Sequence, residues 1–397
     1  MTGLSHCVVC GASHARPVWS VEKAPLYPFR PVARIGSDFG FGRLAIVECD
    51  RCGHLYNAAF DPGGADDLYS SFVLTNQPVS PSMLKAVEMV AETILRHAKP
   101  RPSVLEIGGG GGALSLQLAS HAREVHLVEP SRAVTAARFA GTGVTLHNTM
   151  FPATTLGRQR FDVVACRQVI EHVPEPASFL AALRTRLSED GLVYLELPSA
   201  EYIRRHRSIV DFHYPHVHYY RRCEMTALLL RAGFAVVDVI DIKDGHDMAF
   251  LLAAASPSVA ASMPRPPGDG LSDALMDGYR RGARRLAQMA APVALYGANA
   301  YSQALLGLYP DVTIFGAVFD DTPSYAAKSA YGPQTDLPIE QPTAERLHRY
   351  TAILVTAYLH DQPIAEKIRA MGFSGPIHTV RSDPAIKPST IVSSLFQ

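Results

Sequence analysis

The sequence predicts an α/β protein built on a doubly wound parallel sheet, with a small cysteine-rich unit before it and a smaller α/β unit after it. Four of the six cysteines lie within the first 52 residues, as two C-x-x-C-G pairs. Short apolar strands then alternate with helical segments between residues 103 and 199. A second alternation follows a segment rich in Pro, Ser and Gly at 256–270. Such alternation is typical of parallel sheets, so we predict domains at 1–65, 66–255 and 256–397.

The two cysteine pairs predict a zinc site in the first unit. "CVVCG" supplies Cys7 and Cys10, and "CDRCG" supplies Cys49 and Cys52. Each pair presents two thiolates from one tight turn, and four thiolates make the tetrahedral set that zinc prefers. No coordination position then remains for a substrate, so the site is predicted to be structural. The alternative, four unliganded core cysteines, does not explain the repeated spacing and glycine.

The elements of the two α/β units follow from periodicity and breakers. Residues 66–100 are predicted to be mostly helical, because "SMLKAVEMVAETILRHA" has apolar residues at helical spacing. In the unit that follows, strands are expected at 103–108, 124–131, from 161 and at 191–199, and helices at 112–122, 132–141 and 176–191. A further strand is expected in "AGFAVVDVIDI". The last unit is expected to repeat the alternation at 293–309, 312–321, 351–360 and 376–380.

The stretch "LEIGGGGGAL" predicts a pocket for an adenosine-type ligand. Gly108–Gly112 lie between a strand and a helix, where glycines let a ligand approach the backbone and the helix start offers free N–H groups. Glu129, at the end of the next strand, is placed to accept both hydroxyls of a ribose. NAD and S-adenosylmethionine both fit this arrangement. A glycine loop that only packs the helix onto the sheet is the alternative.

The wording of three segments resembles the class I methyltransferases, which use S-adenosylmethionine. "VLEIGGGGG" resembles their first motif, "RQVIEHVPEP" (167–176) the segment after their fourth strand, and "GLVYLELP" their fifth strand. The resemblance implies a class I doubly wound sheet, with Glu106 on the methionine amine side and Glu129 on the ribose. The cofactor-binding residues it implies are Glu106, Gly108, Gly110, Gly112, Glu129, Pro130, Gln168 and His172.

The order of the parts across the whole chain resembles the sugar C-methyltransferases. These proteins combine a zinc-binding domain, a methyltransferase core and a C-terminal Rossmann-like domain, and act on nucleotide-linked 4-keto deoxysugars. "LYGANAYSQALL" and "GAVFDDTPSYAAKSAYG" resemble their C-terminal segments. The resemblance implies deprotonation next to the ketone, followed by attack of the enolate carbon on the methyl group.

The segment "FHYPHVHYY" (212–220) is expected to carry the catalysis. The corresponding family segment reads roughly Tyr-His-Glu-His-Val, so His216 matches the general base. The family's tyrosine falls on His213, its first histidine on Tyr214 and its glutamate on Pro215, and the usual H-G-G-S becomes "GHDM" (245–248). His172, Tyr214, Tyr219 and His213 are candidate donors to the enolate oxygen or the sugar. The alternatives are simple packing of these side chains, or a metal site of His213, His216 and His218, which methyl transfer does not need.

Charge and hydropathy limit the other functions. Lys plus Arg and Asp plus Glu both number 37, which disfavours a nucleic-acid backbone as partner. No apolar run is long enough for a membrane span, and no signal peptide is evident. We therefore expect a cytoplasmic monomer or small homo-oligomer acting on a small molecule, with no nucleic-acid or membrane partner. Methylation of oxygen or nitrogen on the same scaffold, and a zinc-ribbon nucleic-acid-binding protein, are the alternatives.

The C-terminal unit lacks a full G-x-G-x-x-G motif, so NAD binding is not predicted there. This unit either binds the nucleotide of the substrate or is a structural remnant.

Overall fold

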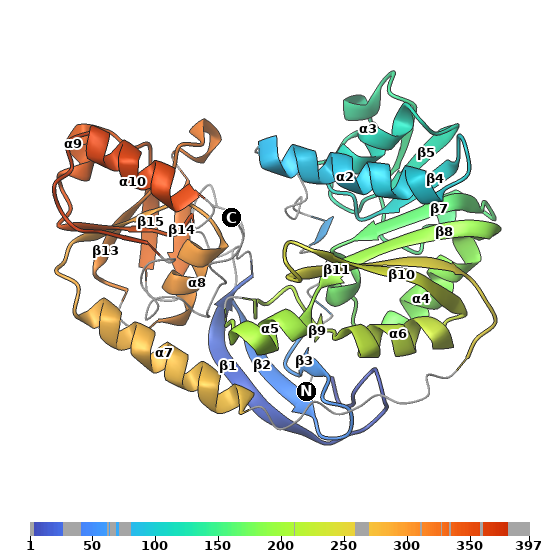
Figure 1. Ribbon diagram of the computed structural model, residues 1–397, viewed down its shortest axis with the longest axis horizontal. Helices are drawn as coiled ribbons and strands as arrows, with labels where there is room; N and C mark the ends of the chain where they lie inside the picture. Colours follow the sequence, from blue (N-terminus) through green and yellow to red (C-terminus); the bar gives the residue numbers. More distant parts are fainter. Residues whose placement is uncertain are drawn as a thin grey trace.

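The computed structural model describes residues 4–26, 41–61, 63, 69–70, 81–209, 211–258, 270–309, 312–326, 328–332, 335–357 and 360–379. These residues form three sheets (Figure 1). The predicted boundary at 65/66 and most of the predicted linker at 256–270 lie outside the described residues, so the domain limits stay predictions. Within the described part of the chain, no helix is both long and apolar enough to cross a membrane.

The central sheet has seven strands in the order β10-β11-β8-β7-β4-β5-β6. Strands β8, β7, β4, β5 and β6 are parallel, and β11 runs antiparallel to β8 and to β10. This is the predicted α/β doubly wound sheet of the class I methyltransferases, closed by one antiparallel hairpin. The strands are β4 (Ser103–Ile107), β5 (Glu124–Val128), β6 (Val144–His147), β7 (Phe161–Arg167), β8 (Leu187–Pro198), β10 (Phe234–Ile242) and β11 (Asp247–Ala254).

Both faces of this sheet are buried, as the apolar strands predict. Successive residues of β7 belong to opposite cores: Val163 packs on one side, whereas Val164 packs on the other. The helices that accompany the sheet are α2 (Pro81–His97), α3 (Ala113–Ala119), α4 (Pro176–Arg186), α5 (Ala200–His206) and α6 (Arg222–Arg231). Cys166, on β7, is fully buried in the core of this sheet.

Two predicted helices are shorter in the structure. The segment 132–141 forms only a 3-10 turn at Ala136–Phe139, because its side chains cover the glycine loop: Arg138 donates to the Gly111 carbonyl at 2.7 Å, and the Phe139 ring packs on Gly112. The helix expected at 176–191 ends at Arg186. Residues from Leu187 onward pair with β7, so tertiary pairing overrides the local helical pattern there.

The N-terminal sheet is antiparallel, in the order β1-β2-β3-β9. Its strands are β1 (Ala15–Pro25), β2 (Phe41–Cys49), β3 (Leu55–Asn57) and β9 (His218–Tyr219). The last strand comes from the segment predicted to be catalytic. In that pairing Leu55 lies opposite Tyr219, and Tyr56 opposite His218. The N-terminal sheet therefore holds the end of this segment through backbone hydrogen bonds.

The C-terminal sheet has six strands in the order β14-β15-β13-β12-β16-β17, and only β14 is antiparallel to its neighbour. Its strands are β12 (Val293–Tyr296), β13 (Phe315–Phe319), β14 (Ser329–Gly332), β15 (Thr335–Glu340), β16 (Ala352–Val355) and β17 (Ile377–Thr379). Its helices are α7 (Leu271–Ala287), α8 (Ala300–Leu308), α9 (Ala344–Leu347) and α10 (Asp361–Ala370). Helix α7 lies beside β1 of the N-terminal sheet (Figure 1). Its residues Leu271 and Leu275 belong to one core cluster with Trp19.

At the start of α8 the backbone donors are already used within the protein. The Asn299 side chain accepts hydrogen bonds from the N–H groups of Tyr301 and Ser302. Asp320, directly after β13, accepts hydrogen bonds from the N–H groups of Ala298 at 2.7 Å and Thr322 at 2.8 Å. These hydrogen bonds give Asp320 a structural role in closing the turn.

Candidate active site and cysteine cluster

The glycine loop after β4 takes a backbone shape that only glycine adopts without strain. Gly108, Gly110 and Gly112 have φ values of 69°, 55° and 75°. A Cβ atom on Gly109 would lie 2.4 Å from the Glu106 carboxyl carbon. Four of the five glycines are therefore required by the local geometry, and the loop is held over the carboxyl end of β4.

The two acidic residues predicted to bind the cofactor, Glu106 and Glu129, hold this loop and the start of α3 by hydrogen bonds. Glu106 is buried and accepts hydrogen bonds from the N–H and hydroxyl of Ser115, and burial raises its pKa. Glu129 accepts from Gly110 N at 2.8 Å and from Ser131 N at 3.0 Å. Burial also raises the pKa of Glu129. Both acids lie at the carboxyl ends of adjacent parallel strands, where doubly wound sheets bind ligands.

Two further predicted cofactor residues, Gln168 and Pro130, lie on the same edge of the sheet. Gln168 follows β7 with a φ of 55°, and its side-chain amide donates to Glu196 at 3.4 Å. Such a conformation is uncommon for a residue with a side chain and is a form of strain often found at functional sites. Pro130 is half-buried directly after Glu129.

We expect Glu129→Gln to weaken S-adenosylmethionine binding roughly tenfold to hundredfold, because an amide would replace the carboxyl group predicted to accept hydrogen bonds from the ribose hydroxyls. Isothermal titration calorimetry measures the change. Glu124→Gln is the matched control, because Glu124 lies at the opposite end of β5 and its side chain is exposed enough to reach solvent. Equal affinities for both variants and the unchanged chain would remove Glu129 from the cofactor site.

The predicted catalytic histidines come together beside the 3-10 turn Ile170–His172 that follows β7. The His216 ring lies 4.7 Å from the His172 ring and 3.8 Å from the His213 ring, centroid to centroid. His213 and His216 are buried. Burial lowers the pKa of His172 to about 4, and burial with the neighbouring histidines lowers the pKa of His216 well below its usual range. A neutral imidazole is the form that can accept a proton.

The two predicted tyrosines differ in their surroundings. The Tyr219 hydroxyl donates to the main-chain oxygens of His213 and His216, at 3.4 Å each, and so braces the loop. The Tyr214 ring packs 5.5 Å from the Phe60 ring and against Gly42 of the N-terminal sheet. His218 does not join the histidine cluster. It bonds to His54 at 3.2 Å and to the Pro174 carbonyl at 3.2 Å.

Glu171 is a site residue that the sequence did not predict. Its carboxylate is fully buried, and its Oε1 atom lies 3.8 Å from His172 Nε2 and 3.9 Å from His216 Nε2. Burial, together with Asp247 and Glu196, raises the pKa of Glu171 well above its usual range. The signal was present in the quoted "RQVIEHVPEP", where Glu171 precedes His172, but its contact with His216 depends on the fold.

A second unpredicted group lies in the "GHDM" segment. His246 bonds to Asp247 at 2.7 Å and to Asp211 at 3.1 Å. These two carboxylates raise the pKa of His246 to about 10 despite its burial. The imidazole is therefore charged at neutral pH, on the side of β11 where that strand meets the carboxyl end of β8.

The His246 charge predicts a pH effect on stability. Because the folded state raises its pKa from about 6.5 to about 10, its contribution is complete below about pH 6.5. That contribution is lost as the pH rises through 10. The free energy of unfolding in urea should therefore decrease between pH 6.5 and 10. His246→Gln should make this decrease smaller, whereas His121→Gln, at an exposed position, should leave it unchanged. An equal decline in both variants would contradict this assignment.

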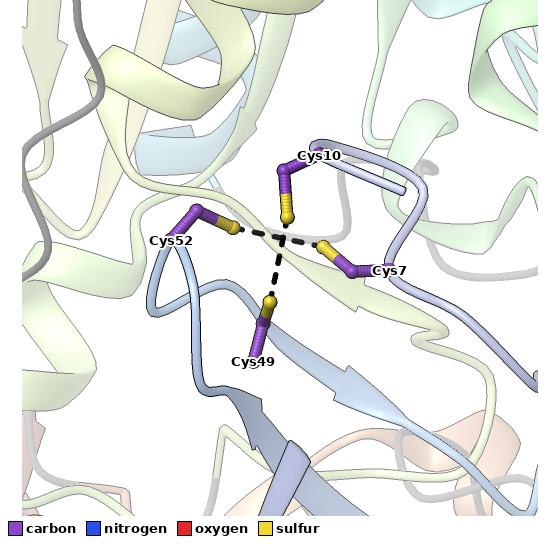
Figure 2. A group of neighbouring side chains, drawn as sticks. All are labelled: Cys7, Cys10, Cys49 and Cys52. Atoms are coloured by element: carbon purple, nitrogen blue, oxygen red, sulfur yellow. Dashed lines mark hydrogen bonds between the residues drawn. The ribbon is translucent and has the colours of Figure 1, made fainter. Parts of the chain in front are cut away.

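The four predicted zinc ligands converge in the structure. Cys7, Cys10, Cys49 and Cys52 are free thiols whose sulfur atoms all lie within 4.8 Å of one another and point toward a common centre (Figure 2). The Sγ atoms of Cys7 and Cys52 are 3.6 Å apart, and those of Cys10 and Cys49 are 3.5 Å apart. Sulfurs around a tetrahedral zinc lie about 3.8 Å apart, so the donor set fits this ion. Cys223, in contrast, is a free, half-buried thiol on α6.

The cysteine cluster is tied to the predicted catalytic segment. Arg221 donates to the Cys52 carbonyl at 2.6 Å and pairs with Glu224. Arg204 donates to the Gly53 carbonyl at 2.9 Å and pairs with Glu48. These buried contacts fix the cysteine turn against α5 and α6, on either side of residues 212–220.

Comparison with known proteins supports the fold of the central unit. Residues 83–239 match a protein family described as a methyltransferase domain. The chain is 35% identical over 98 residues to a ubiquinone biosynthesis O-methyltransferase of Paraburkholderia xenovorans (strain LB400), covering 23% of this chain and 42% of that protein. It is 30% identical over 159 residues to the protein of that name in Pseudomonas aeruginosa (strain LESB58), covering 35% of this chain and 67% of that protein. The chain thus spans less than half the length of the first relative.

A solved S-adenosylmethionine-dependent methyltransferase from Clostridium acetobutylicum ATCC 824 is also similar in structure. It has a TM-score of 0.37 and 13% sequence identity, and the match covers 43% of this chain and 91% of that one.

Proposed function

The chain belongs to the methyltransferase-domain family, and on this premise we propose that it transfers a methyl group from S-adenosylmethionine to carbon in a nucleotide-linked keto-deoxysugar. The observation that carries the proposal is the position of the histidine cluster. His172 and His216 lie beside the carboxyl end of β7, and the glycine loop with Glu129 follows the neighbouring strands of the same sheet. A proton acceptor thus lies near the edge where the methyl donor would bind.

The chain's own residues supply binding and proton transfer. S-adenosylmethionine, when bound, supplies an electrophilic sulfonium methyl group. Glu129 would accept hydrogen bonds from the ribose hydroxyls, Glu106 would serve the methionine side by shaping the loop, and the loop backbone would hold the adenosine. His216 accepts the proton from the carbon next to the ketone, because its imidazole is buried and neutral. His172 and His213 line the same place and orient the sugar. Holding the two carbons close supplies much of the remaining rate.

Zinc in the cysteine cluster would serve structure alone. Cys7, Cys10, Cys49 and Cys52 would fill all four positions of the ion, which leaves none for substrate. Its effect on the reaction would pass through Arg221 and through β9, which continues the segment that carries His216.

Methylation of oxygen is the second candidate, and the names of the relatives favour it. Both are O-methyltransferases of ubiquinone biosynthesis. The same base would then take a hydroxyl proton and no ketone would be needed. The change from the family's Glu to Pro215 in "FHYPHVHYY" is compatible with such a shift in acceptor.

Incubation with S-adenosylmethionine labelled with ¹³C in the methyl group tests the proposal. A panel of nucleotide-linked 4-keto-6-deoxysugars and hydroxylated aromatic compounds should be used, and product NMR distinguishes a carbon-bound from an oxygen- or nitrogen-bound methyl group. We expect a carbon-bound methyl group on a keto sugar. A methyl group on oxygen of an aromatic compound, with no product from any sugar, would replace the proposal by the second candidate.

A further inference from the structure

Glu171 is buried beside the histidine cluster, on the 3-10 turn that follows β7. Its exposure is 1%, and neither carboxylate oxygen is hydrogen-bonded within the part of the chain that the structure describes. Its main-chain oxygen accepts from Val217 N at 2.8 Å, which fixes the turn against the segment that carries His216. A buried acid without partners is costly for stability, and such costs are typical of functional groups.

The tautomer of His172 shows which atoms around Glu171 are acceptors. His172 Nδ1 lies 2.7 Å from the Pro215 carbonyl oxygen, which can only accept, so Nδ1 carries the proton. In the neutral ring Nε2 then presents a lone pair toward Glu171 Oε1 at 3.8 Å. A carboxylate there would oppose one lone pair with another, whereas a carboxylic acid supplies a donor.

We propose that Glu171 is a further catalytic residue, a carboxylic acid whose O–H donates to the ketone oxygen of the substrate as that oxygen becomes an enolate. This inference rests on the proposed carbon methylation and adds the acid to the base. His216 Nε2 lies 3.9 Å from Glu171 Oε1, so the base and the acid stand side by side. The distances from Glu171 Oε1 to His172 and to His216 are both too long for a hydrogen bond, so the acid stays available to donate to a substrate. Catalytic hydrogen bonds often shorten only when the substrate is bound.

Two further observations favour Glu171 over the predicted tyrosines. The Tyr219 hydroxyl is engaged with two main-chain oxygens, and the Tyr214 ring packs against the N-terminal sheet. Burial and the nearby acids Asp247 and Glu196 raise the pKa of Glu171, which favours the protonated acid. An acid held neutral by its surroundings is an effective donor to an enolate.

The step balances without any further reactant. The carbon next to the ketone loses its proton to His216, and the C–H electron pair forms a C=C bond while the carbonyl pair moves to oxygen. That oxygen accepts the hydrogen bond of Glu171. The carbon then bonds to the methyl group, the methyl–sulfur bond breaks with its pair going to sulfur, and the ketone re-forms. The proton leaves His216 to solvent.

Infrared difference spectroscopy tests the protonation directly and needs no substrate. The C=O stretch of a buried carboxylic acid should be present at neutral pH and should be absent in Glu171→Gln. Glu175→Gln is the matched control, because Glu175 is exposed at the start of α4 and should leave the band unchanged. A spectrum of Glu171→Gln identical to that of the unchanged chain would overturn the proposal.

Solvent exchange tests the role in catalysis. In heavy water and without S-adenosylmethionine, the unchanged chain should place deuterium next to the ketone of a sugar that it methylates. Glu171→Leu should slow this exchange roughly hundredfold or more, because a donor to the oxyanion is lost. Glu171→Gln should slow it only about tenfold, because its amide still donates. Leucine removes a buried acid, so this variant should melt at an equal or higher temperature, which separates a catalytic loss from unfolding.

Two results would overturn the inference while leaving methyl transfer intact. Equal losses in Glu171→Leu and Glu171→Gln would show that a carboxylate is required. Elemental analysis that finds a metal ion beyond the one held by the cysteines, lost in Glu171→Gln, would make Glu171, His172 and His216 a metal site instead. Absence of carbon methylation with the infrared band present would reject the proposed function but not the protonated acid.

Discussion

His216→Ala is expected to lower methyl transfer by about 10² to 10⁴-fold, the usual contribution of a general base. Affinity for S-adenosylmethionine should stay within about twofold, because the glycine loop and Glu129 are built from β4, β5 and their loops, whereas His216 belongs to the segment before β9. Single-turnover kinetics and calorimetry measure the two quantities separately.

Two further variants keep this prediction interpretable, since His216 is buried and its removal leaves a cavity. His216→Gln fills most of the space but cannot act as the base, so it should be as inactive as alanine. His97→Ala, at an exposed position on α2, should retain full activity. Undiminished turnover in a folded His216 variant would remove His216 from the mechanism.

Cys52→Ser is expected to lose the metal and to unfold the N-terminal sheet. Structural zinc contributes on the order of 10 kcal/mol to the folding of small cysteine sites, and Cys7, Cys49 and Cys52 pack in the same core as the central sheet. Loss of this turn would break the hydrogen bond from Arg221 to the Cys52 carbonyl and weaken the pairing of β3 with β9. Methyl transfer should therefore fall with the melting temperature.

Elemental analysis and thermal melting check the metal prediction. The unchanged chain should hold one zinc per chain at the four cysteines, and Cys52→Ser none. Cys223→Ser is the matched control, because Cys223 lies on α6 outside the cluster and should leave both values unchanged. Full stability and activity after loss of the metal would show that the cysteine turn is independent of the active site.

The parts that sequence predicted are those with local signals. The glycine loop, the paired cysteines and the alternation of β4 to β8 each follow from residues close together in the chain. The expected helix at 132–141 failed because Arg138 and Phe139 are used to cover the glycine loop, a long-range demand that periodicity does not report.

The missed parts of the site depend on long-range pairing. Strand β9 has two residues, and it joins the N-terminal sheet only because Leu55 and Tyr56 are brought beside it. Glu171 comes within 3.9 Å of His216 through the contact between the 3-10 turn and the loop before β9. The raised pKa of His246 depends on Asp211, which is 35 residues away in the chain, as well as on the neighbouring Asp247.

The most direct test of carbon methylation is a reaction in heavy water, followed by mass spectrometry. Nucleotide-linked 4-keto-6-deoxysugars would be incubated with the chain, first without and then with S-adenosylmethionine. Carbon methylation predicts deuterium next to the ketone in the first incubation and a methyl group on that carbon in the second. A methyl group gained with no such exchange, and attached to oxygen or nitrogen, would contradict it.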